Sequence, residues 1–244
     1  MHPNPPDTVT PLRGISSMAT RAVLAELAAG FEAQSGQKVV IESVGGVDAA
    51  QRVAAGEAFD LVLLASDALD KLIAAGHVLA GRVDYVHSPV AIAVRAASST
   101  GTDHPPLPDV GSEAALRAAV QAAASIGYST GPSGQHLMRL FARWGLAGEL
   151  ASRTVQAQPG VPVGQQVASG EVALGFQQLS ELQGLPGITI LGLLPADCAF
   201  ITTFSGGVAA ASAQPDAARA FLAHLNSPGT ADTKRRHGMT PVQT

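Results

Sequence analysis

Apolar and polar positions follow two different periods along the first half of the chain. Residues 23–31 place apolar side chains at the i, i+3 and i+4 positions of an amphipathic helix, which Gly36 is expected to end. Residues 38–44 are rich in β-branched side chains, and residues 59–65 form an apolar run typical of a buried parallel strand. Because strands and helices alternate, the pattern predicts an α/β fold with a mostly parallel sheet.

The same patterns predict the remaining elements. Further strands are expected at residues 9–12, 83–86, 90–94, 124–128, 153–157, 172–176, 187–191, 200–204 and 208–211. Further helices are expected at residues 49–55, 66–75, 113–124, 163–169, 178–182, 215–225 and 230–236, and one begins near residue 133. Residues 1–8 are expected to form an extended arm and residues 96–108 a loop, since turn-forming residues are frequent in both.

The alternation of strand and helix is interrupted twice, near residues 86–90 and 198–206, where extended segments replace helices. Two extended crossings are what a two-lobed protein needs when its second lobe is inserted into the first. We therefore expect lobe 1 at residues 1–87 and 205–244 and lobe 2 at residues 88–204. Since ligands of open α/β sheets bind at the carboxyl ends of the strands, the expected binding cleft lies between the lobes.

Three turns in this pattern are suited to anions. Residues 128–136 (Tyr-Ser-Thr-Gly-Pro-Ser-Gly-Gln-His) join a strand to a helix N-terminus, and residues 14–18 and 44–48 repeat the arrangement. The free N–H groups and the positive dipole end of a helix favour negative charge at such a turn. Three turns of this kind predict a protein that closes on a small anion.

Composition narrows the partners of the protein. The formal net charge is −4 and no basic run is present, so a nucleic-acid backbone is not an expected partner. The single cysteine, Cys198, and the absence of a Cys/His cluster with ligand spacing leave no metal or cofactor to expect. No apolar run reaches membrane-spanning length, so membrane insertion is not expected. Residues 1–7 lack the features of a signal peptide, which predicts a cytoplasmic protein, although a periplasmic protein whose signal has been removed would look the same.

Candidate site residues follow from these turns. Ser17 with Ser16 can donate hydroxyl and N–H groups to a ligand oxygen or can cap the next helix, and Arg13 can clamp a carboxylate or lie on the surface. His136 is the first candidate for a general base, because a helix N-terminus favours neutral imidazole, and Asp48 is the second; a capping or surface role is the alternative for both. The full set of expected ligand-binding residues is Arg13, Ser16, Ser17, Gly46, Ser66, Ser129, Thr130, Gly131, Ser133, Gly134, Val163, Gln177, Gln178 and Thr203. Glu181 is expected to be solvated.

Four stretches resemble the molybdate-binding proteins of ABC transporters, which are type II periplasmic binding proteins. They are residues 14–18 (Gly-Ile-Ser-Ser-Met), 51–62 (Gln-Arg-Val-Ala-Ala-Gly-Glu-Ala-Phe-Asp-Leu-Val), 66–67 (Ser-Asp) and 167–176 (Val-Ala-Ser-Gly-Glu-Val-Ala-Leu-Gly-Phe). The resemblance implies a two-lobed fold in which each lobe is a mostly parallel sheet flanked by helices, with two extended hinge strands between them. It also implies a small anionic ligand.

The chain departs from that family where the family binds its oxyanion. Gly46 or Val47 stands where the family has a serine, and Gln178 stands where it has a tyrosine. Amides in place of hydroxyls suit flat carboxylates, so the ligand expected here is a di- or tricarboxylate, and the chain looks more like the aconitate isomerase-like branch. That branch implies an isomerase that moves a double bond by a 1,3-proton shift. The alternatives are a solute-binding protein that delivers molybdate or a small organic anion to an ABC permease, without catalysis, and a ligand sensor.

Overall fold

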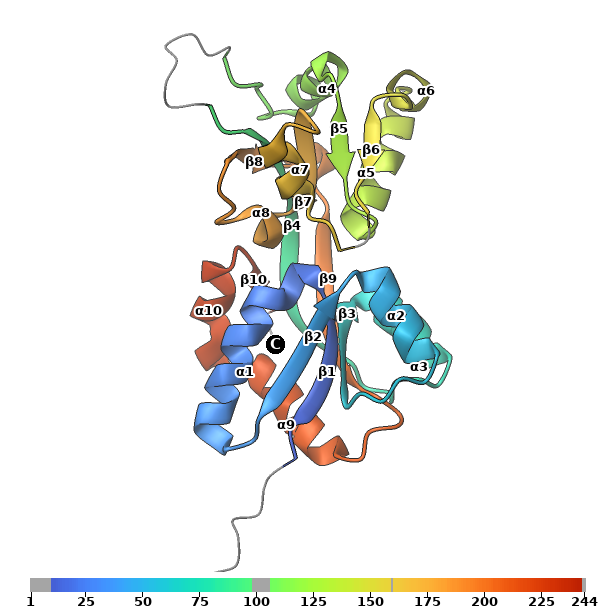
Figure 1. Cartoon of the computed structure of the whole chain (residues 1–244), viewed down its shortest axis with the longest axis vertical. Helices are drawn as coiled ribbons and strands as arrows, with labels where there is room; N and C mark the ends of the chain where they lie inside the picture. The colour runs from blue at the N-terminus through green and yellow to red at the C-terminus, as the bar shows by residue number, and fades with distance from the viewer. Residues whose placement is uncertain (1–9, 98–105, 159, 243–244) are drawn as a thin grey trace, which may run out of the picture.

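The computed structural model describes residues 10–97, 106–158 and 160–242, which form two lobes stacked along the long axis of the molecule (Figure 1). The expected arm at residues 1–8 lies outside the described residues, as do Val9 at the start of the first expected strand, most of the expected loop at 96–108, and Pro159. None of the helices in the described part of the chain is long and apolar enough to cross a membrane.

Lobe 1, the lower half of Figure 1, is built on three parallel strands in the order β2-β1-β3. These strands are β1 (Leu12–Ser17), β2 (Val39–Val44) and β3 (Leu61–Ala65). One face of the sheet packs against α1 (Arg21–Ser35) and α9 (Pro215–Leu225), and the other packs against α2 (Gly46–Ala54) and α3 (Ser66–Ala74). Helix α10 (Ala231–Arg236) packs against α1.

The sequence of strand β3 is continuously apolar because helices cover both faces of this strand. Leu61 and Leu63 belong to the core under α1 and α9, whereas Val62 and Leu64 belong to the core under α2 and α3. Successive side chains of a strand point to opposite faces, so a strand covered on both faces needs an apolar residue at every position.

Lobe 2 has its own parallel sheet, in the order β7-β5-β6. Its strands are β5 (Ile126–Tyr128), β6 (Thr154–Gln156), β7 (Leu174–Gln178) and the antiparallel β8 (Ile188–Leu193). Its helices are α4 (Glu113–Ala122), α5 (Pro132–Arg143), α6 (Ala147–Leu150), α7 (Val163–Ser169) and α8 (Leu179–Leu182). The core clusters of this lobe lie within residues 90–200, and those of lobe 1 use residues 12–86 and 204–239.

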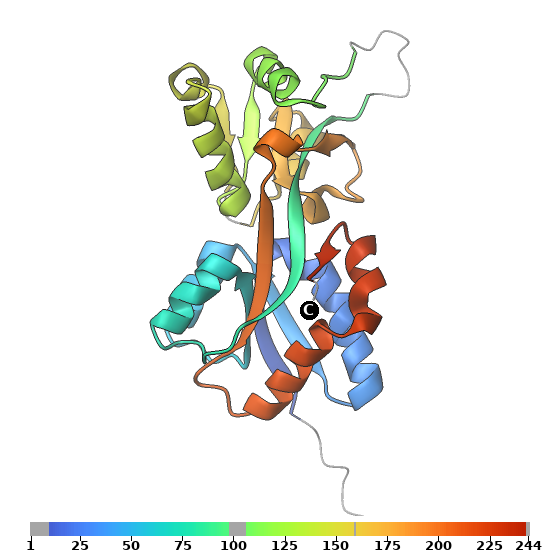
Figure 2. The same cartoon turned by 180° about the vertical axis from the view of Figure 1, so that it is seen from behind.

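Two long antiparallel strands run from one lobe into the other (Figure 2). They are β4 (Val83–Arg95) and β9 (Ile201–Val208), and the expected lobe boundaries at residues 87/88 and 204/205 fall inside them. Residues 83–86 and 90–94, predicted as two strands, form one continuous strand through Ser88-Pro89. Strand β9 likewise runs through Gly206-Gly207, across the gap between the predicted strands at 200–204 and 208–211. A Cβ at Gly206 would lie 2.4 Å from Leu222 Cδ2, so this glycine lets α9 pack closely on a continuous strand.

The first strand is also placed differently from the prediction. Strand β1 covers Leu12–Ser17, so the expected turn at residues 14–18 is mostly strand, followed by the 3₁₀ turn Met18–Thr20. Gly14 is part of the sheet, where a Cβ would lie 3.2 Å from Ile41 Cγ1 and 3.3 Å from Leu61 Cβ. Three smaller differences are the earlier start of α2, the extension of β7 to Gln178, and the additional elements α6 and β10 (Thr240–Pro241), which pairs with β4.

Candidate functional site

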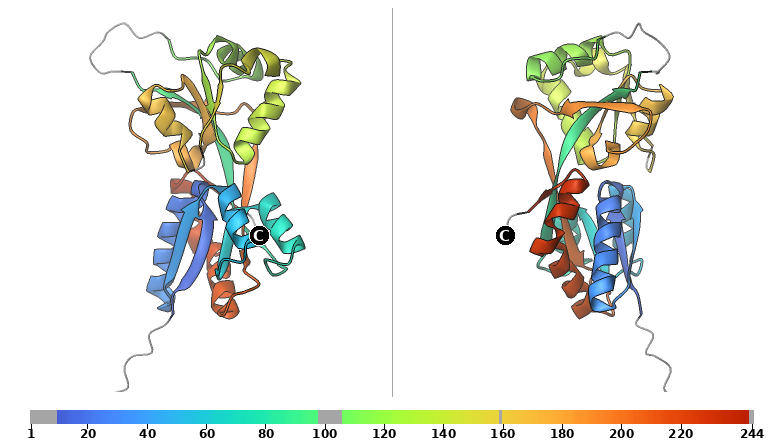
Figure 3. Two further views of the ribbon diagram at one scale, coloured as in Figure 1. Left: turned by 45° about the vertical axis from the view of Figure 1, so that its right-hand side comes forward. Right: turned by 90° about the vertical axis from the view of Figure 1, so that its left-hand side faces the viewer.

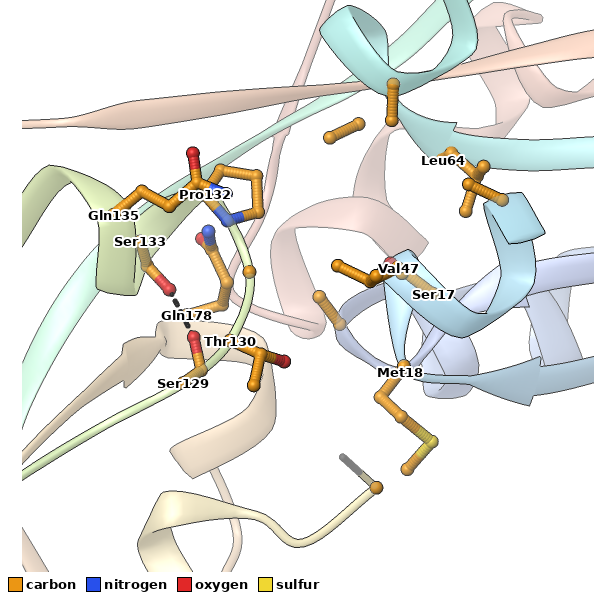
Figure 4. Close-up of a pocket in the computed structure, with 18 of the residues that line it drawn as sticks. Ser17, Met18, Val47, Leu64, Ser129, Thr130, Pro132, Ser133, Gln135 and Gln178 are labelled. Atoms are coloured by element: carbon orange, nitrogen blue, oxygen red, sulfur yellow. Dashed lines mark hydrogen bonds between the residues drawn. The ribbon is translucent and has the colours of Figure 1, made fainter. Parts of the chain in front are cut away.

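A cavity of about 440 Å³ lies between the two lobes and is lined from both sides (Figure 4). Figure 3 shows the ribbon of the two lobes from two further directions. Its size is within the range of small-molecule sites. Lobe 1 supplies the end of β1, the 3₁₀ turn after it and the starts of α2 and α3. Lobe 2 supplies the loop before α5, residues 157–158 and 160–162 before the start of α7, and the junction of β7 and α8. The cavity therefore lies at the carboxyl ends of the parallel strands of both lobes.

Three helices direct their N-termini at this cavity. Helix α2 begins after Gly45, α3 after Ala65 and α5 after Gly131, and none of these N-cap residues makes a side-chain capping hydrogen bond. The first N–H groups of an uncapped helix are free to bind a ligand, and the helix dipole favours an anion there. The sequence produces this arrangement by placing glycine or alanine, whose side chains cannot cap, at these three N-cap positions.

Ser17 is a buried polar residue that lobe 1 contributes to this site. Its residue is only 8% exposed, and its Oγ has no hydrogen-bond partner in the described structure. Ser17 lies beside Val47 at the wall of the cavity (Figure 4). A buried hydroxyl without a partner costs free energy, so its position in a cavity indicates a ligand oxygen as its partner.

The loop from β5 to α5 forms the facing wall in lobe 2. The Oγ atoms of Ser129 and Ser133 are 2.9 Å apart and hydrogen-bonded to each other (Figure 4). Gly134 makes the turn tight, because a Cβ there would lie 1.8 Å from the carbonyl oxygen of Ser129. The loop thus holds Thr130 and Gly131 at the cavity wall with little room to relax.

Two adjacent glutamines end β7 at the cavity and have different partners. The Gln178 amide, in the orientation that satisfies its neighbours, donates to the carbonyl oxygens of Ser88 and Pro89 and accepts from the Thr202 hydroxyl. Gln178 therefore links the two hinge strands to the cavity wall. Gln177 accepts a hydrogen bond from the Gly164 N–H at 3.1 Å, at the start of α7.

Gln177 also donates from Nε2 to Glu181 Oε1, at 2.8 Å, one helical turn further along the chain. Glu181 lines the cavity, and burial of its carboxyl group raises the pKa to about 7, while the hydrogen bond from Gln177 acts in the opposite direction. The expectation that Glu181 is solvated is wrong, because α8 packs against β4, β7 and the 3₁₀ turn of lobe 1, where Ser180 Oγ donates to the Ala19 carbonyl oxygen at 2.8 Å.

The structure brings together eight of the expected ligand-binding residues at the cavity. They are Ser17, Gly46, Ser129, Thr130, Gly131, Ser133, Gln177 and Gln178. All three turns that the sequence predicted as anion sites thus contribute residues to one cavity.

Neither expected general base lines the cavity. His136 lies on another face of α5, where its Nε2 is 3.2 Å from the Cys198 carbonyl oxygen and its ring stacks on Phe200 at 4.5 Å between centroids. Partial burial lowers the pKa of His136, so its imidazole is neutral as expected, but it does not face the ligand. Asp48 is exposed in the first turn of α2.

Other expected site residues also lie outside the cavity lining. Arg13 is near the opposite end of β1, with its guanidinium 5.7 Å from the centre of the Phe59 ring. Thr203 points to the other side of β9 from Phe204 and bonds to His87 Nδ1 at 3.0 Å, because strand side chains alternate. The remaining four are Ser16, which bonds to Ser43, the buried Gly134 and Val163, and Ser66.

Several residues that line the cavity were not predicted from the sequence. Lys71 and Asp67 lie on α3, and both are exposed. Apolar side chains supply much of the rest of the wall; they include Met18, Val47, Leu64, Leu72, Val161 and Phe204. The spacing Gln177-x-x-x-Glu181, which begins at the end of a buried strand and spans one helical turn, is the signal that could have identified Glu181.

A two-lobed α/β protein with two hinge strands and a ligand-sized cleft between its lobes is a binding protein by architecture. The profile of the bacterial extracellular solute-binding protein family matches residues 12–240. The chain belongs to this family, which confirms the resemblance to type II periplasmic binding proteins and the two-lobed fold.

Individual relatives point to two kinds of function. An aconitate isomerase from Pseudomonas sp. is 38% identical over 241 residues, which are 96% of this chain and 89% of that protein. The periplasmic molybdate-binding protein of Azotobacter vinelandii superposes with a TM-score of 0.77 at 22% identity, covering 95% of this chain and 100% of that one. A tungstate-binding protein from Desulfovibrio alaskensis superposes with a TM-score of 0.67 at 20% identity, covering 96% and 100%. These two structures share the fold of this chain.

Proposed function

We propose that this protein binds a small unsaturated di- or tricarboxylate between its lobes and isomerises the double bond of this ligand by a 1,3-proton shift. The observation that carries the proposal is the combination of uncapped helix N-termini and the unpaired Ser17 hydroxyl with largely apolar walls. N–H and hydroxyl donors suit carboxylate oxygens, and apolar walls suit the carbon skeleton between them. The 38% identity to an aconitate isomerase over nearly the whole chain supports the same chemistry.

The reaction needs a proton to leave a carbon next to a carboxylate and to return at the far end of the double bond. Negative charge then develops on carboxylate oxygens in the transition state. Helix N-termini aimed at these oxygens stabilise the charge without reorganising, because their dipoles are fixed by the fold. Closing the lobes on the ligand would exclude water and strengthen these interactions.

The second candidate is a solute-binding protein that hands its anion to an ABC permease without chemistry. The fold shared with the molybdate- and tungstate-binding proteins favours it. It predicts binding with no conversion, so the two candidates differ in a single measurement.

That measurement is incubation of the purified protein with cis- or trans-aconitate, with the ratio of isomers followed by NMR. The proposal expects both reactions to reach the same final ratio at a rate proportional to protein concentration. No conversion of either isomer, together with tight binding of molybdate or tungstate in calorimetry, would establish the binding-protein alternative. A cytoplasmic location is part of the proposal, and fractionation of cells with an antibody to the protein tests it.

A further inference from the structure

Three ionisable side chains occur among the described residues that line the cavity, and they differ in surroundings. Asp67 and Lys71 are exposed on α3 in lobe 1, whereas Glu181 is partly buried on α8 in lobe 2. A group that moves protons between a ligand and itself must be shielded from bulk water and must hold its position. Only Glu181 among these three satisfies both conditions.

The position of the Glu181 carboxyl group is fixed by a chain of two hydrogen bonds. The Gly164 N–H can only donate, so it holds the amide oxygen of Gln177 toward α7 at 3.1 Å. The Nε2 of the same amide must then face the other way, where it donates to Glu181 Oε1 at 2.8 Å. Oε2 of Glu181 has no hydrogen-bond partner among the residues that the structure describes. One carboxyl oxygen is anchored, and the other is available to a ligand.

We infer that Glu181 is the group that removes and returns the proton during isomerisation; this inference rests on the proposed function. The Glu181 carboxylate takes a proton from the saturated carbon that bears a carboxylate. The electron pair of the broken C–H bond forms a new double bond to the central carbon, and the electrons of the former double bond take the proton back from Glu181 at the other terminal carbon. Glu181 ends ionised, as it began, and the reaction consumes no oxidant, reductant or co-substrate.

The surroundings of Glu181 suit this task. Burial raises its pKa to about 7, so the carboxylate is a stronger base than an ordinary glutamate and is still ionised in much of the protein at neutral pH. The elements packed against α8 are β4, β7, the 3₁₀ turn Met18–Thr20, the start of α7 and the end of α10 with the residues that follow it. Of these, β7, the 3₁₀ turn and α7 carry no ionisable side chains. On the α10 side, where Gln183 Nε2 donates to the Arg236 carbonyl oxygen, the ionisable residues are Asp232, Lys234, Arg235, Arg236 and His237. The ionisable residues of β4 are Asp84, Tyr85, His87 and Arg95. The part of β4 that shares a core cluster with α8 is Ala91 and Ala93. Asp67 and Lys71 face the cavity from lobe 1.

The test compares wild type with Glu181→Gln, which keeps the shape and a hydrogen-bonding capacity but cannot take a proton. The matched control is Glu32→Gln, which removes one exposed carboxylate of α1 outside the cavity. Two properties are measured at about pH 8: kcat for trans-aconitate by NMR, and the Kd for propane-1,2,3-tricarboxylate by calorimetry. This saturated analogue has the three carboxylates but no double bond to move.

We expect Glu181→Gln to lower kcat by about 10²–10⁴-fold, while the analogue binds as tightly as to wild type or more tightly. Binding is expected to hold because one negative charge facing an anion has been removed. In wild type, kcat is expected to rise with pH with an apparent pKa at or above about 7, since a bound anion raises the pKa of Glu181 further. The residual activity of Glu181→Gln should lack this rise, and Glu32→Gln should match wild type.

The outcomes distinguish a failure of the proposed function from a failure of the role assigned to Glu181. No conversion of aconitate by wild type overturns the proposed function. Conversion by wild type with a kcat of Glu181→Gln within threefold of it overturns the assignment of Glu181 alone. A large loss of kcat accompanied by an equal loss of analogue binding also overturns the assignment, because it shows that Glu181 supports the shape of the cavity.

Discussion

The raised pKa of Glu181 has a consequence for stability that needs no substrate. The carboxyl group has a pKa of about 7 in the folded protein, against an ordinary value of 4.5 that applies to the unfolded chain. The folded state therefore holds a proton that the unfolded state has lost, and stability falls as pH rises between these two values. The rise in pKa corresponds to about 3 kcal/mol in total, of which about 2.5 kcal/mol falls between about pH 5 and about pH 8.

The substitution Glu181→Gln removes this dependence, since glutamine does not ionise. Relative to wild type, the free energy of unfolding of the variant should increase by about 2.5 kcal/mol between about pH 5 and about pH 8. Urea unfolding of the ligand-free proteins at several pH values and constant ionic strength measures it, with equal m-values as a check that the unfolded states match. The control, Glu32→Gln, reports the effect of removing one exposed carboxylate. A difference between the two variants that is flat from pH 5 to pH 8 would refute the burial of an ionisable Glu181.

Three further predictions test other parts of the site. Ser17→Ala should weaken binding of propane-1,2,3-tricarboxylate by about tenfold or more in calorimetry, because a hydrogen bond to a charged group contributes about 1.5–3 kcal/mol. The free energy of unfolding of this variant should not fall, since the removed hydroxyl has no protein partner among the described residues. Gly134→Ala should lower the free energy of unfolding by more than about 2 kcal/mol and weaken binding of the tricarboxylate analogue, because the added Cβ would overlap the Ser129 carbonyl oxygen. A free energy of unfolding equal to that of wild type would contradict the packing of the loop. His136→Ala should leave kcat for aconitate within about twofold of wild type, since the imidazole bonds to the Cys198 carbonyl oxygen outside the cavity, and a hundredfold loss would restore it as the base.

The period of the apolar positions and the residues typical of turns made most of the fold predictable from the sequence. The continuously apolar run at 59–65 identified β3, and the cluster of small residues at 129–134 identified the start of α5. Glycines caused the main errors. Gly14, Gly206 and the residue after it lack a side chain because neighbouring side chains fill that space, and a glycine required by packing looks the same in sequence as one required by a turn.

The site was less predictable, because the sequence indicates where a residue lies along a strand or helix more reliably than it indicates which way its side chain points. Ser16 and Ser17 are adjacent in β1, yet Ser16 bonds to Ser43 and only Ser17 lines the cavity. His136 lies on the expected helix, but on a side where its ring stacks on Phe200 outside the cavity lining. Glu181 looked like one more polar residue of a short helix, but the packing of α8 against β4, β7 and the 3₁₀ turn of lobe 1 partly buries it.

The crossing of β4 and β9 between the lobes also sets an order of assembly during synthesis. Lobe 2 is one continuous stretch, so its core can close as soon as residue 200 or so has left the ribosome. The sheet of lobe 1 stays open for longer, because Leu61 of β3 must wait for Val208 of β9 as its neighbour. During that interval the edge of β3 that will pair with β9 and the apolar surface that α9 will cover are exposed, so this part of lobe 1 is open to wrong contacts until the end of the chain has been made.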